Sequence, residues 1–269
     1  MRFPDILMAA SQGGGFKYDA LASTYFAGVV SAGGSVSVAR KALVNNLIVG
    51  LRSDGDLASL DYMLLLCAED SQGALLDVIS GVTATAVNSP TFTANQGYAG
   101  NGTTSYVNSN FNASTMGVAY TNNSCHLMIY DRTSRTGSTL VGNCGANDAT
   151  PTQTRIGTLL LGGFNGDLND QTNLTGANAN AQGLYINSRT SSVQVDAYLA
   201  GASIASSGAA TSTGVANVPF FIGGENSLGV LARATTDQHG FFSCGGGMTA
   251  AQALRVNTRV QTFLTGVGL

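Results

Sequence analysis

Val193-Gln194-Val195-Asp196-Ala197-Tyr198-Leu199 alternates aliphatic residues with polar or aromatic ones, and this stretch decides the fold class. Successive side chains of a β-strand point to opposite faces, so its four aliphatic residues would share one buried face. Ala200-Gly201 then predicts a tight turn into a return strand that begins Ala202-Ser203-Ile204. We therefore expect an antiparallel hairpin here.

The same pattern extends over residues 82–247, where Thr, Val, Asn, Gly, Tyr and Phe replace the helix formers. Short alternating segments are separated by Gly and Asn turns, and Pro219–Gly224 resembles another buried strand with a glycine exit. Many short strands at such spacing are typical of an antiparallel sandwich or barrel. The sequence predicts a mainly β jelly-roll sandwich over residues 82–247.

Helical spacing precedes this region, and residues 35–81 are expected to form a helical collar. One helix is predicted over Ser35–Leu51, with Ser35 or Ser37 as its cap, a second over Leu57–Leu65 and a short third over Gln72–Ile79. Residues 1–34 are rich in Gly, Ala and Ser and are interpreted as an arm that orders against a partner or against the rest of the chain.

A helix is also predicted over residues 248–269, packed on the sandwich or on the collar. Thr249 and Gln252 have the spacing of a capping box, in which a hydroxyl and an amide satisfy two free backbone N–H groups. Val256, Val260 and Leu264 belong to one apolar stripe along this helix.

The low content of charged residues argues against some classes of function. Charged residues make up 10% of the 269, the net charge is −3, and the only lysines are Lys17 and Lys41. Nucleic-acid binding requires clustered Lys and Arg, so we expect no nucleic-acid partner. No apolar run reaches the roughly 18 residues of a membrane span, and Met1–Asp5 lacks the apolar core of a secretory signal, so cytoplasmic synthesis is expected.

The four cysteines are scattered, without a CxxC pair. Buried free thiols are expected, because cytoplasmic assembly disfavours disulfides. A disulfide between Cys125 and Cys144, across neighbouring strands, is the alternative.

Several segments resemble a family of phage and prophage proteins. They are the runs Ala86–Ala94, Gly97–Val107 and Asn110–Asn112, the upstream Gly33–Ser37, and the closing Met248–Gln252. Members of this family are described as tail, fibre or other virion proteins with a concanavalin A-like lectin domain. A weaker likeness, at Ala197–Ile204 and Phe221–Gly224, is to laminin-G-like modules.

The resemblance implies a virion protein, with the arm 1–34 as its anchor to other virion proteins. A tail or fibre-type appendage that attaches to a host-surface glycan is the first expectation. A capsid decoration or head-fibre protein with a purely structural role is the alternative, and a glycan-cleaving enzyme is the third. The low charge and small residues favour a homo-oligomer, and a trimer is expected by resemblance to phage appendages.

Catalytic constellations are missing from the sequence, so we expect no enzyme. Glycosidases need two carboxylates facing one bond, yet the only glutamates, Glu69 and Glu225, are far apart in the chain, and Asp196 has no carboxylate two residues away. His126 and His239 are isolated, and no Gly-x-Ser-x-Gly motif accompanies them.

Binding residues are easier to nominate. Asp167, Asn169 and Asp170 lie in an oxygen-rich loop that could hold Ca²⁺, but an Asx-rich surface turn is the preferred interpretation of this loop. No other cofactor is expected. Glycan binding would use amide and carboxylate oxygens with an aromatic face, and the chain has no Trp to stack on a sugar. The candidates are Tyr120, Asn122, Asn123, Asn165, Asp167, Asn169 and Tyr185.

Overall fold

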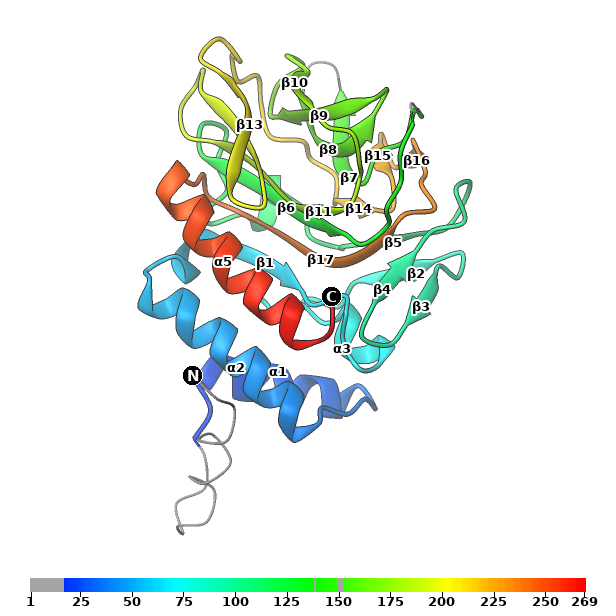
Figure 1. The fold of residues 1–269 in the computed structure, drawn as a ribbon, viewed down its shortest axis with the longest axis vertical. Coiled ribbons are helices and arrows are strands. Elements are labelled where there is room, and N and C mark those ends of the chain that lie inside the picture. The colour runs from blue at the N-terminus through cyan, green and yellow to red at the C-terminus, as the bar shows by residue number, and fades with distance from the viewer. Residues whose placement is uncertain (1–16, 138, 150–151) are drawn as a thin grey trace.

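The computed structural model describes residues 17–137, 139–149 and 152–269, and these form three layers (Figure 1). Two antiparallel sheets face one another, and helices cover one of them on the face that points away from the other sheet. We call the sheet next to the helices the middle sheet and the other the outer sheet. No helix in the described ranges is long and apolar enough to cross a membrane.

The middle sheet has eight strands. Seven follow one another in the spatial order β13 (Ala202–Ser207), β12 (Val195–Leu199), β11 (Gly183–Arg189), β6 (Cys125–Asp131), β17 (Gln238–Gly245), β4 (Gly97–Ala99) and β3 (Thr91–Thr93). The eighth, β1 (Leu60–Leu64), also pairs with β17. The predicted hairpin is confirmed, since β12 and β13 pair antiparallel across the turn at Ala200-Gly201. The predicted buried face begins only at Val195, because Val193 precedes β12 and is exposed.

The outer sheet has nine strands. Its main order is β10 (Leu174–Ala177), β9 (Gly163–Leu168), β8 (Thr152–Leu160), β7 (Cys144–Ala149), β14 (Phe221–Ile222), β5 (Tyr106–Asn108) and β2 (Thr85–Val87). A hairpin of β15 (Glu225–Ser227) and β16 (Val230–Ala232) joins it, because β15 pairs parallel with β7. The predicted two-sheet sandwich is therefore confirmed, although it begins before residue 82, since β1 belongs to the middle sheet.

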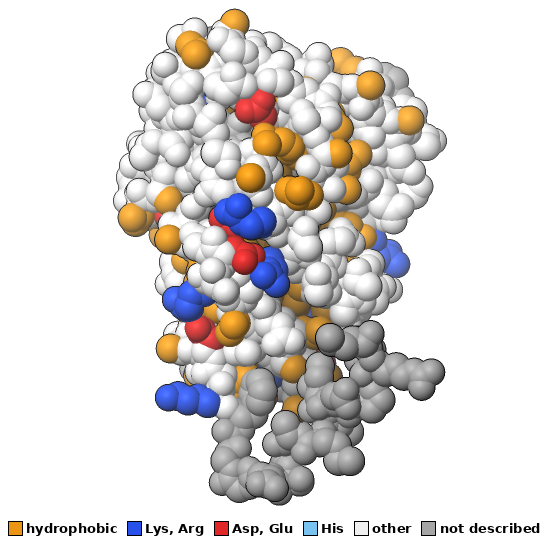
Figure 2. All heavy atoms as spheres, turned by 60° about the vertical axis from the view of Figure 1, so that its left-hand side comes forward, with side chains coloured by type: hydrophobic (Ala, Val, Ile, Leu, Met, Phe, Trp, Pro, Cys, Tyr) orange, Lys and Arg blue, Asp and Glu red, His pale blue; other side chains and the backbone are white. Residues whose placement is uncertain are grey.

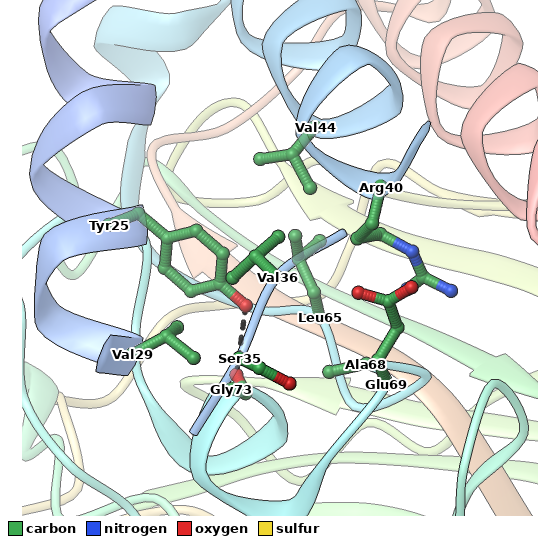
Figure 3. A pocket seen from close by; sticks show the side chains of 10 residues that line it. All are labelled: Tyr25, Val29, Ser35, Val36, Arg40, Val44, Leu65, Ala68, Glu69 and Gly73. Atoms are coloured by element: carbon green, nitrogen blue, oxygen red, sulfur yellow. Dashed lines mark hydrogen bonds between the residues drawn. The ribbon is translucent and has the colours of Figure 1, made fainter. Parts of the chain in front are cut away.

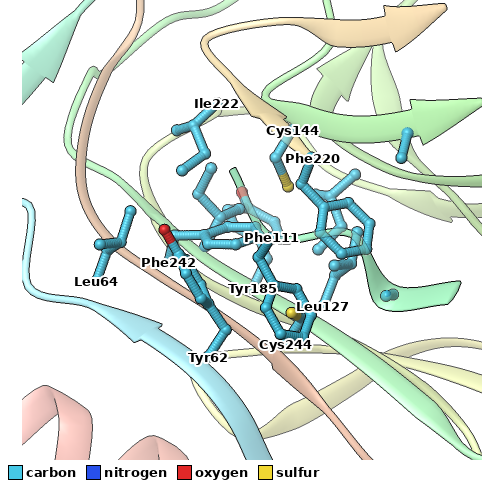
Figure 4. Packing of buried hydrophobic residues seen from close by; sticks show 14 of the residues in the cluster. Tyr62, Leu64, Phe111, Leu127, Cys144, Tyr185, Phe220, Ile222, Phe242 and Cys244 are labelled. Atoms are coloured by element: carbon cyan, nitrogen blue, oxygen red, sulfur yellow. The ribbon is translucent and has the colours of Figure 1, made fainter. Parts of the chain in front are cut away.

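Two hydrophobic cores hold the three layers together. The first lies between the sheets and contains the rings of Tyr62, Phe111 and Phe242 (Figure 4). Tyr62 packs on Phe111 with ring centroids 5.1 Å apart and donates its hydroxyl to the Ser109 carbonyl at 2.7 Å. The second core lies between the middle sheet and the helices. Alternation along the strands of the middle sheet fills both cores, since neighbouring residues point into different ones.

The helices are α1 (Ala20–Ser31), α2 (Val38–Ser53), α5 (Ala250–Gly266) and the short α3 (Ser71–Leu75) and α4 (Ala113–Met116). Ser37 caps α2, and Thr249 with Gln252 forms the predicted capping box of α5. Helix α5 packs on the middle sheet and also on α2, and its Arg255 pairs at 2.8 Å with Asp56, which lies just after α2. The C-terminal helix thus contacts both of its predicted partners.

Much of the predicted arm belongs to this helical layer. Helix α1 buries Tyr25, Phe26 and Val29, and the Tyr25 hydroxyl donates to the Gly73 carbonyl of α3 at 3.0 Å (Figure 3). The cavity beside Tyr25 measures about 10 Å³, which is room for about one water. Residues 20–31 therefore order against the rest of the chain, whereas residues 1–16 of the predicted arm lie outside the described residues.

The predicted helix over Leu57–Leu65 is wrong. A 3₁₀ turn, Leu57–Ser59, leads into strand β1, whose residues are all buried. Met63 enters the core under the helices while Tyr62 and Leu64 enter the core between the sheets. A strand buried on both faces loses its alternation, and its leucines then imitate helical spacing.

The predicted free thiols are confirmed. Cys67, Cys125, Cys144 and Cys244 are buried and unpaired. The alternative disulfide between Cys125 and Cys144 is therefore absent from this structure.

Candidate functional site

Several loops meet at the end of the sandwich where β6 begins and β11 ends. They comprise residues 121–124, 169–173, 190–193 and 209–213, which we call the rim. The loops bond to one another: Thr213 N donates to the Asn169 carbonyl at 2.7 Å and Ser212 N to the Ser192 carbonyl at 2.8 Å. Ser212 Oγ reaches Asn123 Oδ1 at 2.6 Å. Segments up to 92 residues apart in the chain thus form one surface.

Asn169 is one buried residue that holds the rim. Its Nδ2 donates to the carbonyls of Thr121 and Asn122, both at 3.1 Å. Its Oδ1 accepts from the Tyr120 hydroxyl at 3.1 Å and from Thr154 Oγ1 at 3.0 Å. Because its amide is fully engaged and unexposed, Asn169 positions the loops and offers no group to a ligand.

Arg189 is the second buried residue that holds the rim, and sequence reasoning missed it. Its guanidinium pairs with Asp170 and donates to the carbonyls of Leu168 at 2.7 Å, Ala210 at 2.7 Å and Ser191 at 3.1 Å. A planar guanidinium suits such a hub because its five donors point in fixed directions. An arginine at the end of a strand has no distinctive sequence pattern, so only the fold reveals this role.

Two aromatic glycan candidates lie inside the sandwich. Tyr120 is 4% exposed and packs against Phe220, and Tyr185 is fully buried with its ring stacked on Phe164 at 6.0 Å. Burial raises the pKa of Tyr185 to about 12. In this structure neither ring can stack on a sugar, which corrects their nomination as an aromatic face for a glycan.

The amide candidates fall in two places. Asn122 and Asn123 lie in the rim, where Asn123 is exposed and Asn122 is half-buried. The Asn122 Oδ1 has no hydrogen-bond partner. Asn165 lies mid-strand in β9, opposite Gly157 of β8, and so outside the rim. Asp167 lies in the same strand, two residues closer to the rim.

Guanidinium groups face the two acidic calcium candidates, Asp167 and Asp170. Arg155 Nε lies 2.8 Å from Asp167 Oδ2, and Arg189 pairs with Asp170. Asn169 is engaged with other groups, so the three candidates do not converge on one point. Within the described ranges, no group of three or more His, Cys, Asp or Glu side chains could hold a metal ion. The three candidates therefore form no converging ligand set in this structure.

Paired carboxyl groups do occur at the opposite end of the sandwich. Asp131 and Asp237 are both unexposed, and Arg135 Nη2 contacts Asp237 Oδ2 at 2.9 Å. His239 lies beside them with both ring nitrogens unpartnered, and burial lowers its pKa to about 4. These groups are nearly inaccessible, so they resemble a structural network more than the open carboxylate pair of a glycosidase.

Comparison with known proteins supplies the fold and no family. No family model and no curated protein matches this sequence. Trypanosoma rangeli sialidase, solved as a covalent intermediate with 2,3-difluorosialic acid, is similar with a TM-score of 0.55 and 15% identity over 81% of this chain and 38% of that one. A mutant of the same sialidase that displays trans-sialidase activity gives a TM-score of 0.52, 13% identity, and 84% and 40% coverage.

Domain 4 of AbnA, an arabinanase from Geobacillus stearothermophilus solved with arabinotriose, has a TM-score of 0.49 and 12% identity over 74% of this chain and 98% of that domain. This chain spans about two fifths of the length of the sialidases it matches. The sialidase likenesses and the observed sheets show a concanavalin A-like two-sheet sandwich with N-terminal helices and a C-terminal helix.

Proposed function

We propose that this chain is a virion appendage subunit whose lectin-like sandwich presents the rim to a glycan on the host cell. One observation carries the glycan part: buried Asn169 and Arg189 hold the rim loops so that amide and hydroxyl side chains face solvent. Such groups form directional hydrogen bonds with sugar hydroxyls. The virion part rests on the sequence resemblance alone.

The proposed role is binding without bond cleavage. Glu225 is 3% exposed and its carboxylate pairs with Arg233 at 2.8 Å, and Asp167 is equally committed to Arg155. A general acid and a nucleophile must both reach the scissile bond, which these buried ion pairs do not. Release of reducing sugar from host polysaccharide by the purified chain would contradict this part of the proposal.

A glycan array with the full chain tests the binding. We expect host-envelope glycans to bind, and the double variant Asn123→Ala/Thr172→Ala to weaken binding about tenfold through lost hydrogen bonds. Both residues are exposed, so the fold should survive. Thr136→Ala is the matched control, because Thr136 is exposed in the loop that follows β6, at the other end of the sandwich. Equal binding by the unmodified chain, the double variant and the control would contradict the proposal that the rim binds the glycan.

A purely structural role is the alternative, in which the chain holds neighbouring subunits together as a capsid decoration. A groove of about 800 Å³ between α2 and α5, lined in part by Leu43, Thr258 and Thr262, favours contact with another copy.

We propose a homo-oligomer, with a trimer expected on sizing with light scattering. Imaging of labelled protein on intact phage particles would show whether the protein lies on the head or on the tail. If a variant without residues 1–16 is no longer incorporated into the particle, that result would support an anchor in this segment.

A further inference from the structure

The rim carries no free charge, and this observation restricts its ligand. Its eleven exposed residues are uncharged: Thr121, Asn123, Gln171, Thr172, Asn173, Thr190, Ser192, Val193, Ala209, Thr211 and Thr213. Asp170 is the one charged residue of the rim, and it is 2% exposed and paired with Arg189. We infer that the rim binds neutral glycans and discriminates against sialylated or otherwise anionic ones. This inference rests on the proposed function.

Binding an anionic sugar would require a free cation near the rim. A carboxylate loses its hydration on binding, and this cost is recovered when a guanidinium or ammonium group pairs with it. The two nearest cations already have protein partners: Arg189 is unexposed and bonded to Asp170 and to loop carbonyls of the rim. Arg155 is 4% exposed and lies against Asp167 and Asn173.

Most of the remaining described cations belong to the helical layer or to the opposite end of the sandwich, and Arg233, which follows β16 of the outer sheet, pairs with Glu225 at 2.8 Å. Arg52, Arg255 and Arg259 belong to the helical layer and pair there with Asp19, Asp56 and Asp54. Figure 2 shows the face on the left-hand side of Figure 1. On this face, most Lys and Arg side chains lie at the height of the helices, and the upper part of the sandwich shows few of them. With a net charge of −3, the whole chain also repels an anion.

The rim also lacks an aromatic residue, as its four segments show in the sequence. Recognition would therefore depend on amide and hydroxyl groups that contact sugar hydroxyls, without ring stacking. Neutral hydrogen bonds are individually modest, so one rim should bind weakly. An oligomer that presents several rims would gain affinity by avidity.

A matched glycan pair tests the inference: one oligosaccharide with and without its terminal sialic acid, bound to the full-length protein. We expect the neutral form to bind about tenfold more tightly, with little change between about 0.05 and 0.5 M NaCl, because no ion pair forms. Tighter binding of the sialylated form, or binding that falls steeply with salt, would overturn the inference and leave glycan binding intact. Binding of neither form would overturn the proposed function itself.

A gain of charge provides a second test. Thr172→Lys places an ammonium group on the exposed rim and should raise binding of the sialylated form about tenfold in low salt, an increase that added salt removes. Thr136→Lys places the same charge at the other end of the sandwich and should leave binding unchanged. Equal effects of the two variants would show that the ligand does not contact the rim, and so would contradict the inference.

Discussion

Asp131 and Asp237 are buried carboxyl groups that share one donor, since Asn143 Nδ2 lies 2.7 Å from the first and 3.2 Å from the second. Only Asp237 has a cation, Arg135, and Asp131 instead accepts from Thr158 Oγ1 at 3.0 Å. Burial and then the neighbouring Asp237 charge raise the pKa of Asp131 well above 3.8. Burial opposes ionisation of Asp237 too, but the Arg135 hydrogen bond leads the effects that hold the pKa of Asp237 below its ordinary value. The pKa values of the two carboxyls are therefore shifted in opposite directions.

The raised pKa of Asp131 predicts how stability depends on pH. Because the pKa of Asp131 is higher in the folded protein than its ordinary value of 3.8, protonated Asp131 adds to the free energy of unfolding. This contribution is complete below pH 3.8 and is lost as pH rises through the folded pKa. Asp131→Asn removes that loss, so the variant should gain stability relative to the wild type as pH rises. Denaturant unfolding of both proteins from acidic to neutral pH measures the difference, and a difference independent of pH would contradict the raised pKa of Asp131.

Asp237→Asn is the matched isosteric change, and it should lower the free energy of unfolding at neutral pH, whereas Asp131→Asn should raise it. It leaves the Arg135 guanidinium, 16% exposed, without its carboxylate. We expect a loss of about 3 kcal/mol in unfolding free energy at neutral pH, because one member of a buried ion pair becomes uncompensated. Urea unfolding at one pH compares the two variants, and equal losses would show that the two carboxyls are equivalent.

The buried histidines predict acid sensitivity. Burial lowers the pKa of both His126 and His239 from 6.5 to about 4. The unfolded chain therefore binds more protons between these values, and stability should fall as pH drops from 6.5 towards 4. His239→Leu should reduce this slope at little cost, since its ring nitrogens have no partner. His126→Leu should cost more, because it removes a 2.7 Å contact with the Gly246 carbonyl. Unfolding midpoints across this pH range measure both effects.

Asn187 predicts a stabilising substitution. It is unexposed, and neither side-chain polar atom has a hydrogen-bond partner. Asn187→Leu keeps the shape and removes the unsatisfied groups, so we expect a gain of about 1 kcal/mol or more. Asn143→Leu is the control, and it should lose about 3 kcal/mol because its amide bonds Asp131, Asp237 and Thr158. Losses of similar size in both variants would mean that Asn187 has partners in solution.

The thiols predict a labelling pattern. Burial raises the pKa of Cys67 and of Cys125 to about 12, so neither forms a reactive thiolate at neutral pH. A thiol reagent should label none of the four cysteines in the native protein and all four after unfolding without a reductant. Two thiols after unfolding would instead demonstrate a disulfide.

Local patterns determined much of this protein. Alternation over Val193–Leu199 predicted β12 and its hairpin, and the Thr249–Gln252 spacing predicted the α5 cap, because a strand face and a helix cap each depend on residues only a few positions apart. The charge-poor composition, visible in the sequence, underlies the neutral rim.

Only the tertiary structure decided which polar residues face a ligand. Asn123 and Asn169 are chemically alike, yet one is exposed while the other is buried and bonded to two carbonyls of another loop. Strand β1 differs from a helix only because two cores cover both of its faces. Burial and hydrogen-bond partners depend on contacts between distant segments, and a local pattern does not contain them.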